Sequence, residues 1–244
     1  MRREILGVGF DNLTVEEAVA QAAGIIESGG GSYVVTPNPE IVWLCRKNPA
    51  LLEAIQNAEL VLPDGIGIIR GARILKRPLK EKVSGVDFGT TLIKYLAPRN
   101  GSVYLLGAKS GVAERAGKAL ERDYPGIRVV GTQDGYFESN DTVISAINEK
   151  RPDFLMVCMG APRQELWMHQ NRDKLQVGIM AGLGGVVDVL AGETARAPES
   201  WQKMELEWLY RLIKEPGRIR RQIRLPLFLL AVIGQRLKGG DGVG

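Results

Sequence analysis

The sequence predicts an α/β fold in which a mostly parallel, Rossmann-like sheet carries helices on both faces. Two observations support this prediction. Short apolar runs alternate with segments of helical spacing along most of the chain, a pattern typical of parallel strands joined by helices. The chain has 244 residues, of which 45% are hydrophobic and 25% charged, so it can bury the core that such a sheet needs.

The first hundred residues contain two expected strands and several helices. A helix is expected at 14–28, because Asn12 or Thr14 can cap its start and the glycines at 29–31 can end it. Apolar runs at 33–36 and 60–62 predict buried strands. The neighbouring segments have helical spacing: 39–48, 49–57, 65–76 and 85–97.

From residue 102 the alternation becomes more regular. Strands are expected at 102–106, 127–132, 154–159 and 177–181, and helices at 110–123, 141–150 and 162–170. From 198 the pattern is helical and of a different kind. We therefore divide the chain into an α/β core, residues 1–195, and a basic amphipathic C-terminal appendage, residues 196–244, that is suited to dock on a membrane.

Cysteine and histidine usage narrows the class of protein. Cys45 and Cys158 stand in apolar contexts and do not make a disulfide framework, which favours a reducing, cytosolic compartment. The single histidine, His169, argues against a His-based metal site, and we expect it to be structural. The start of the chain has no apolar signal core, and no run reaches the roughly 18 to 20 apolar residues that span a bilayer.

The positive charge is concentrated near the C-terminus. Residues 211–244 carry eight Lys and Arg against two acidic residues, which gives +6 and leaves −2 of the total +4 for residues 1–210. A nine-residue apolar run, 225–233, follows the basic residues. A basic segment joined to a short apolar one is typical of a helix that lies on an anionic membrane surface. The alternative is an amphipathic helix that closes the core or a dimer, and nucleic acid is disfavoured because no nucleic-acid motif is present.

Two polar loops follow the first two apolar runs. Residues 36–40 (Thr-Pro-Asn-Pro-Glu) come after 33–35, and residues 63–65 (Pro-Asp-Gly) come after 60–62. In a parallel sheet such positions lie at the carboxyl ends of the strands, where ligands bind. A hydroxyl, an amide and the Asp64 carboxylate placed there can do chemistry, although an isolated Asp-Gly pair is more often only a turn.

Three glycine turns follow later strands. They are residues 105–111 (Leu-Leu-Gly-Ala-Lys-Ser-Gly), 159–165 (Met-Gly-Ala-Pro-Arg-Gln-Glu) and 181–188 (Ala-Gly-Leu-Gly-Gly-Val-Val-Asp). Such turns let backbone N–H groups and a helix N-terminus face an anion, and three of them favour a nucleotide diphosphate. The spacing of NAD and ATP motifs is missing. The alternative is an ordinary strand-to-helix turn at each place, with Glu165 as a helix cap and Asp188 as a solvated acid.

These motifs, with further blocks in the same order, resemble the WecG/TagA/CpsF glycosyltransferases (family 26), and within that family the TagA branch. The resemblance covers nearly the whole chain. The further blocks are residues 81–87, 104–108, 134–137, 184–188, 196–198 and 207–216.

The resemblance implies an inverting, metal-independent transfer from a UDP-sugar, typically UDP-N-acetylmannosamine, to the 4-hydroxyl of N-acetylglucosamine on undecaprenyl diphosphate. No cofactor is implied, because the UDP-sugar is itself the donor substrate. The enzyme would act in the cytoplasm, on the inner face of the cell membrane, with the appendage docked on the anionic surface. Another UDP-hexose or a uronic acid is an alternative donor. A non-catalytic nucleotide-binding domain with a dimerising tail is the alternative of another class, and homo-oligomers are compatible with either.

The resemblance also assigns roles to residues. Asp64 would be the general base that deprotonates the acceptor hydroxyl. The pocket for the sugar and diphosphate would be lined by Thr36, Asn38 and Gln164. The nucleotide would be held by Gly107, Ala108, Tyr136, Gly160, Gly184 and Asp188. The cations that bind the diphosphate would be Lys82, Arg211, Arg218 and Arg221. Lys82 stands where the family often has Arg, and Lys keeps the charge but not the bidentate fork.

Overall fold

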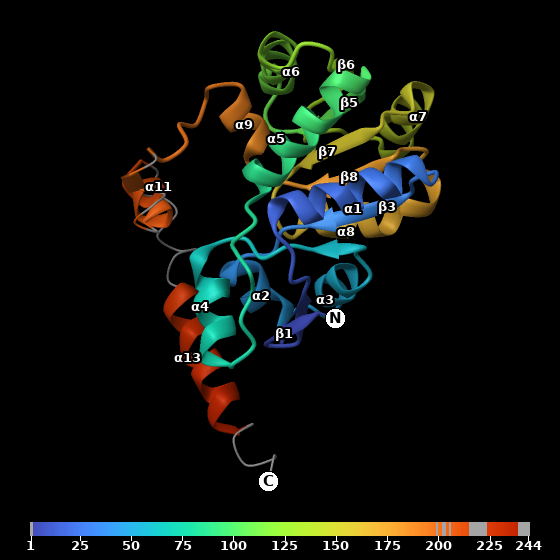
Figure 1. The fold of residues 1–244 in the computed structure, drawn as a ribbon. Coiled ribbons are helices and arrows are strands. Elements are labelled where there is room, and N and C mark those ends of the chain that lie inside the picture. Colours follow the sequence, from blue (N-terminus) through green and yellow to red (C-terminus); the bar gives the residue numbers. More distant parts are fainter. Residues whose placement is uncertain (1, 199, 202–203, 205, 215–223, 239–244) are drawn as a thin grey trace.

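A computed structural model describes residues 2–198, 200–201, 204, 206–214 and 224–238. Among these residues, six strands form one parallel sheet in the order β4-β3-β8-β7-β5-β6 (Figure 1). The predicted α/β class is confirmed. The strands are β3 (Ser32–Val35), β4 (Leu60–Val61), β5 (Ser102–Gly107), β6 (Arg128–Gln133), β7 (Phe154–Cys158) and β8 (Ile179–Gly182).

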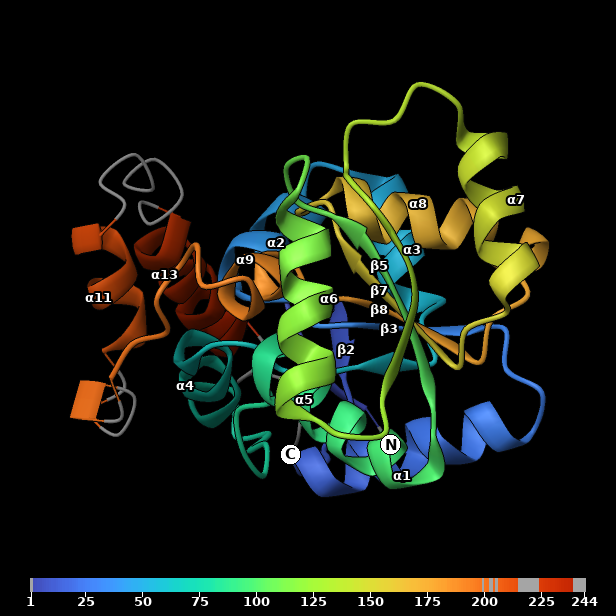
Figure 2. The ribbon, with the colours of Figure 1, turned by 90° about the horizontal axis from the view of Figure 1, so that it is seen from above.

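Helices cover both faces of the sheet, as Figure 2 shows from above. One face packs against α1 (Val15–Glu27), α5 (Gly85–Leu96), α6 (Val112–Asp123) and α9 (Val186–Leu190). The other packs against α2 (Pro39–Cys45), α3 (Pro49–Gln56), α4 (Ile66–Ile74), α7 (Asn140–Lys150) and α8 (Arg163–Asn171). Short 3-10 turns lie at Ala97–Arg99 and Arg172–Lys174. Successive side chains of a strand point to opposite faces, so Val34 joins the first core and Val35 the second.

Local sequence signals explain where the helices begin. Thr14 caps α1 and forms a capping box with Glu17, as its position predicted. Asn38 caps α2, with Pro39 in the first turn. Ser84 caps α5 by accepting the N–H of Asp87. The caps therefore fix the starts of helices that follow the sheet.

An antiparallel hairpin of β1 (Arg3–Ile5) and β2 (Val8–Phe10) was not predicted. Its strands are three residues long, too short to show a clear alternating pattern. Its turn uses Leu6 and Gly7, both with positive φ (50° and 84°). Ile5, Val8 and Phe10 are fully buried, so the hairpin belongs to the core.

The C-terminal helix α13 (Arg224–Lys238) packs against α2 and α4 (Figure 1). Phe228 and Val232 are fully buried in the same core cluster as one face of the sheet. A Cβ at Gly71 of α4 would lie 3.2 Å from the Phe228 ring, so the absence of a side chain there admits the ring. The sequence left two roles open for residues 225–233, a helix on a membrane surface or a helix that closes the core. The Phe228 face of α13 closes the core.

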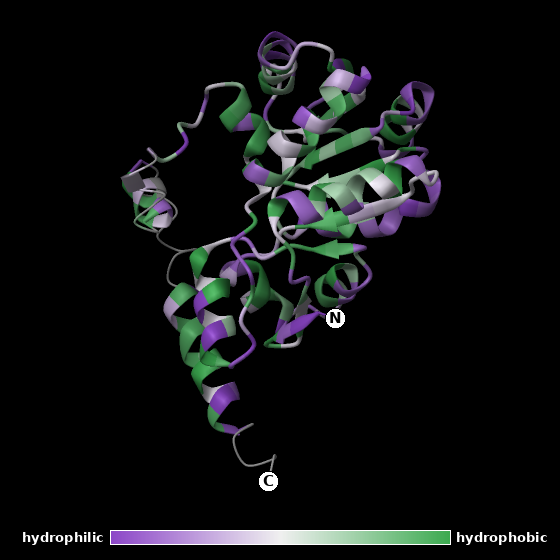
Figure 3. Cartoon of the chain, in the orientation of Figure 1, coloured by the Kyte–Doolittle hydropathy of each residue, from purple (hydrophilic) through white to green (hydrophobic). Residues whose placement is uncertain are grey.

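Four other large apolar side chains of α13 are exposed. They are Leu227 (39% exposed), Leu230 (65%), Ile233 (43%) and Leu237 (71%). Figure 3 shows α13 as mostly hydrophobic until its last turn, where hydrophilic residues appear. None of the helices in the described ranges is both long and apolar enough to cross a membrane.

Candidate active site

The polar loops and the glycine turns meet at the carboxyl edge of the sheet, since all six strands of this sheet run parallel. Thr36 directly follows β3, and its hydroxyl donates to the carbonyl of Gly182 at the end of β8, over 3.1 Å. Thr36 is buried, with 7% exposure. The first polar loop is therefore fixed against the third glycine turn.

Asp64 lies beside the first polar loop. Its backbone N–H donates to the carbonyl of Pro37 over 3.2 Å. Gly65 has φ of 88°, a conformation that favours glycine, and starts α4. This turn holds Asp64, which is half-buried, at the end of β4. The structure thus brings the predicted base and residues 36–38 together.

Asn38 and Glu40 have structural contacts in this loop. Asn38 Oδ1 accepts the N–H of Ile41 over 3.1 Å, so this oxygen caps α2. Glu40 Oε1 accepts from Arg224 Nη1 over 2.8 Å, which joins the loop to the start of α13. The motif at residues 36–40 therefore also anchors the C-terminal helix, a role that sequence reasoning did not anticipate.

Gln164 connects two of the glycine turns. Its Oε1 accepts the backbone N–H of Gly160 over 3.2 Å and that of Gly184 over 3.0 Å. Its amide also lies against Gly182, where an added Cβ would be 3.1 Å from Nε2. The Gln164 side chain is 3% exposed. The carboxyl ends of β7 and β8 are thus held together by a single side-chain amide.

Glu165 is buried beside Gln164 and is not the helix cap of the alternative reading. Its Oε1 accepts from Gln164 Nε2 over 2.8 Å, and the residue is 1% exposed. Burial raises the pKa of Glu165 from its ordinary 4.5 to about 7, more than the hydrogen bonds of Gln164 and of its own backbone lower it. The sequence offered one signal for this residue, its place next to Gln164 after a glycine turn.

The predicted nucleotide end lies at β5, β6 and β7. Ala108, with φ of 62°, accepts the N–H of Gly135 over 2.9 Å and donates its own N–H to the Cys158 carbonyl over 3.0 Å. Arg163 Nη1 donates to the Gly135 carbonyl over 2.5 Å. These contacts gather the turns of Gly107, Ala108 and Gly160 around the loop whose Tyr136 is 73% exposed. An exposed ring at this place is free to stack on a base.

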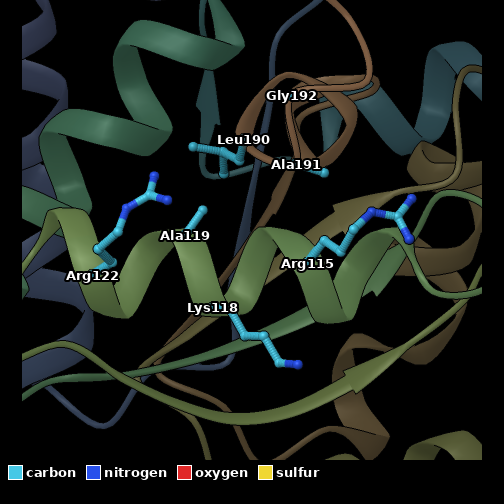
Figure 4. A pocket seen from close by; sticks show the side chains of 7 residues that line it. All are labelled: Arg115, Lys118, Ala119, Arg122, Leu190, Ala191 and Gly192. Carbon is cyan, nitrogen blue, oxygen red and sulfur yellow. The ribbon is translucent and has the colours of Figure 1, made fainter.

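Asp188 lies in the first turn of α9, and its carbonyl accepts the N–H of Glu193 over 2.9 Å. A hollow of about 520 Å³ lies between α6 and α9, lined by Arg115, Lys118, Ala119, Arg122, Leu190, Ala191 and Gly192 (Figure 4). None of the predicted site residues lines this hollow. In Figure 4, Lys118 points away from Leu190. Arg115 pairs with Glu193 and Arg122 with Asp123, so this surface is not an uncompensated basic patch.

Lys82 lies close to the Asp64 turn, because the N–H of Val83 donates to the Pro63 carbonyl over 2.9 Å. Lys82 Nζ lies 3.0 Å from Glu207 Oε2, at the start of α11 (Glu207–Lys214). The cation expected to meet the leaving diphosphate is therefore in contact with a carboxylate from the predicted appendage.

Three arginines of the predicted site belong to that appendage. Arg211 lies within α11, whereas Arg218 and Arg221 fall outside the described residues. The described chain on either side is anchored near the site, by Glu207 at Lys82 and by Arg224 at Glu40. Their predicted contacts with diphosphate stay predictions.

Two smaller expectations concern His169 and the cysteines. His169 Nδ1 lies 3.1 Å from the hydroxyl of Tyr33, which also donates to the Ala54 carbonyl, so the ring has a structural contact on the sheet. Cys45 and Cys158 are buried thiols without a disulfide. In the described part of the chain, no group of three or more His, Cys, Asp and Glu side chains is arranged to hold a metal ion.

Comparison with known proteins decides the family. The model of the glycosyl transferase WecG/TagA/CpsF family matches residues 3–242. The chain belongs to this family. The predicted resemblance is thereby confirmed, and so is the prediction of a glycosyltransferase.

Curated relatives carry a more specific name. A protein of Bacillus spizizenii is 33% identical over 208 residues, which cover 85% of this chain and 81% of the relative. A protein of Staphylococcus aureus is 34% identical over 238 residues, 96% of this chain and 93% of the relative. Both are named N-acetylglucosaminyldiphosphoundecaprenol N-acetyl-beta-D-mannosaminyltransferase.

Proposed function

We propose that this WecG/TagA/CpsF family member transfers N-acetylmannosamine from UDP-N-acetylmannosamine to the 4-hydroxyl of N-acetylglucosamine on undecaprenyl diphosphate, with inversion and without a metal ion. The names of the relatives support the acceptor and the transferred sugar. The observation that carries the proposal is the meeting of Thr36, Asp64 and the glycine turns at one edge of the sheet.

Asp64 is the general base of the proposed reaction. An acceptor hydroxyl is a weak nucleophile, and a positioned carboxylate removes its proton as the new bond forms. The backbone of Asp64 is held to Pro37 over 3.2 Å, which keeps Asp64 beside the loop of Thr36 and Asn38. Attack from the face opposite the leaving group gives inversion at the sugar carbon.

Leaving UDP gains negative charge, which the protein must stabilise. The N-termini of α6 and α8, which follow the Gly107 and Gly160 turns, and the cation Lys82 are suited to this task. Arg211, Arg218 and Arg221 complete the cation set in this proposal. A cation set of this kind replaces the charge that a divalent metal would supply, so we expect turnover to continue in EDTA.

The acceptor is a membrane lipid, and the exposed stripe of α13 suits a membrane surface. We define the apolar stripe as Leu227, Leu230, Ile233 and Leu237. Arg236 and Lys238 lie in the last turn of the same helix, and cations beside exposed leucines favour an anionic bilayer. The enzyme would then be peripheral, on the inner face of the cell membrane.

The test is UDP release from UDP-N-acetylmannosamine with a short-chain acceptor. Asp64→Asn should lower turnover by about 100-fold or more and leave UDP binding intact, whereas Asp141→Asn, at an exposed position of α7, should not change turnover. Unchanged turnover in Asp64→Asn would remove Asp64 from the mechanism. A panel of UDP-sugars identifies the donor, and a protein that binds UDP but releases none would be the non-catalytic alternative.

A further inference from the structure

The orientation of the Gln164 amide is unusually constrained. Its oxygen faces two backbone N–H donors, at Gly160 and Gly184, and its nitrogen faces the Glu165 carboxyl. A side-chain amide can turn over and exchange its oxygen and nitrogen. Turned over, it would place N–H groups against the two glycine N–H groups and an oxygen against the carboxyl. The three neighbours therefore admit one orientation.

Of the three neighbours, only Glu165 is a side chain. The glycine N–H groups are fixed by the backbone at the ends of β7 and β8, so they can hold the oxygen but cannot engage the amide nitrogen. Without Glu165, the nitrogen would lose its acceptor inside a buried site, and a buried donor without a partner costs about 1–3 kcal/mol. Glu165 is thus the group that removes this cost and retains the amide where the two turns meet.

Burial makes Glu165 an expensive residue for packing alone. The residue is 1% exposed, and its Oε2 has no hydrogen-bond partner among the residues that the structure describes. Its surroundings raise the pKa of the carboxyl to about 7. An apolar side chain of similar size would avoid these costs, so core packing does not account for a carboxyl here.

A second explanation for the Glu165 carboxyl is its place in the first turn of α8, because negative charge there stabilises a helix. Glu114 provides the comparison, because it is the third residue of α6 as Glu165 is of α8. Glu114 is exposed, and among the described residues its side chain makes no hydrogen bond to a residue of the site. Substitutions at Glu114 and Glu165 therefore share any effect on helix stability, and only those at Glu165 also affect Gln164.

We propose that Glu165 is a positioning residue of the transfer reaction, whose carboxyl fixes the Gln164 amide so that the Gly160 and Gly184 turns keep their spacing around the donor diphosphate. The inference rests on the proposed function for its catalytic consequence. Glu165 itself does not touch the substrate. It acts through Gln164, and Gln164 through the two turns.

A double-mutant cycle tests the link. Glu165→Met fills a similar volume without a strong acceptor, and we expect turnover to fall by about 10- to 100-fold, the scale of a displaced site group. Glu165→Gln retains an oxygen that can accept from Gln164, and we expect turnover within about threefold of the parent. In a Gln164→Ala background, Glu165→Met should cause no further loss. Glu114→Met is the matched control and should leave turnover unchanged.

The inference is overturned if Glu165→Met lowers turnover equally in the parent and in the Gln164→Ala background. It is also overturned if Gln164→Ala lowers turnover and Glu165→Met does not. A third contradicting result is a Glu165→Gln variant as inactive as Glu165→Met. Should Glu165→Met not fold, Glu165→Ala is subject to the same expectations. Circular dichroism verifies the fold of each variant.

A readout independent of turnover separates this inference from the proposed function. The N–H groups of Gly160 and Gly184 both donate to Gln164 Oε1, so their hydrogen exchange reports the position of the amide. We expect exchange at both glycines to accelerate about tenfold or more in Glu165→Met and to stay near the parent in Glu165→Gln. Unchanged exchange in Glu165→Met overturns the inference, even if the parent enzyme proves active. If the parent releases no UDP but exchange at Gly160 and Gly184 is faster in Glu165→Met, only the proposed function is overturned.

Discussion

Lys82 Nζ and Glu207 Oε2 lie 3.0 Å apart and join the loop beside Asp64 to the first residue of α11. The side chains are 27% and 17% exposed, so the pair is only partly screened by solvent. In the proposed reaction, a diphosphate and the Glu207 carboxylate compete for the same cation.

Glu207→Gln should therefore strengthen UDP binding, by about two- to tenfold for a partly exposed pair. Isothermal titration measures the affinity. Glu149→Gln is the control, because it removes an exposed carboxylate that is paired with Lys150 at the C-terminal end of α7. Weaker UDP binding in Glu207→Gln would show that Glu207 holds Lys82 in position for the ligand instead of competing with it.

Gly67→Ala should destabilise the protein. A Cβ at Gly67 would lie 2.6 Å from Pro39 Cγ and 2.8 Å from Leu225 Cδ1, so the Pro39 ring and the Leu225 side chain must both shift. We expect a loss of about 1–3 kcal/mol in the free energy of unfolding, measured by chemical denaturation. Gly24→Ala in α1 has open space and should instead stabilise, by about 0.5–1 kcal/mol. Equal effects at the two glycines would contradict close packing at Gly67.

Leu230→Asn and Leu237→Asn should weaken binding to vesicles that contain phosphatidylglycerol. Both side chains belong to the apolar stripe, and each leucine that leaves water contributes about 1.5–3 kcal/mol. We expect about a 10- to 100-fold loss for each in a sedimentation assay, with the unfolding free energy changed by less than about 0.5 kcal/mol.

The control for the apolar stripe is the opposite face of α13. Phe228→Ala should lower the unfolding free energy by about 3–5 kcal/mol, because Phe228 is fully buried. Unaltered vesicle binding by both leucine variants would refute the stripe as the membrane contact.

Glu165 should make stability depend on pH. Its pKa is about 7 in the folded protein and near 4.5 when unfolded, so the folded state binds more protons between these values. Stability from this group is therefore fully present below about pH 4.5 and is lost as pH rises through 7. Cys45 of α2 is the titratable neighbour, and its own pKa is raised to about 12 by burial and by Glu165, so it stays neutral in this range.

The measurement compares the parent with Glu165→Gln by denaturation at pH 5 and pH 8. The unfolding free energy of the variant minus that of the parent should rise by about 2–3 kcal/mol from pH 5 to pH 8. A difference that does not vary with pH would mean that Glu165 titrates as an exposed carboxyl does.

Much of the fold followed from local pattern. The strands and helices between residues 14 and 182 were expected within a few residues of their bounds, because a parallel sheet needs apolar runs and helical connections in strict alternation. The β1–β2 hairpin was missed because three-residue strands have too few positions to show a period.

Long-range contacts were harder to predict. The polar loops and glycine turns could be placed at one sheet edge because parallel strands share a direction. The hydrogen bond between Gly184 and Gln164, the Lys82–Glu207 pair and the packing of Phe228 against Gly71 depend on side-chain positions that no local period encodes. Only the fold brings these residues into contact.

Contacts of α13 join distant parts of the chain: Leu6 donates its N–H to Gln235 over 3.1 Å, and Glu40 pairs with Arg224. On the ribosome, α4 emerges about 150 residues before α13 does. At common synthesis rates the nascent protein spends roughly 8 to 30 seconds with the Phe228 side of α4 uncovered. We expect chaperones that bind apolar surfaces to recognise the nascent chain during that interval. We expect a chain that ends before α13 to leave this part of the core exposed to water and to aggregate.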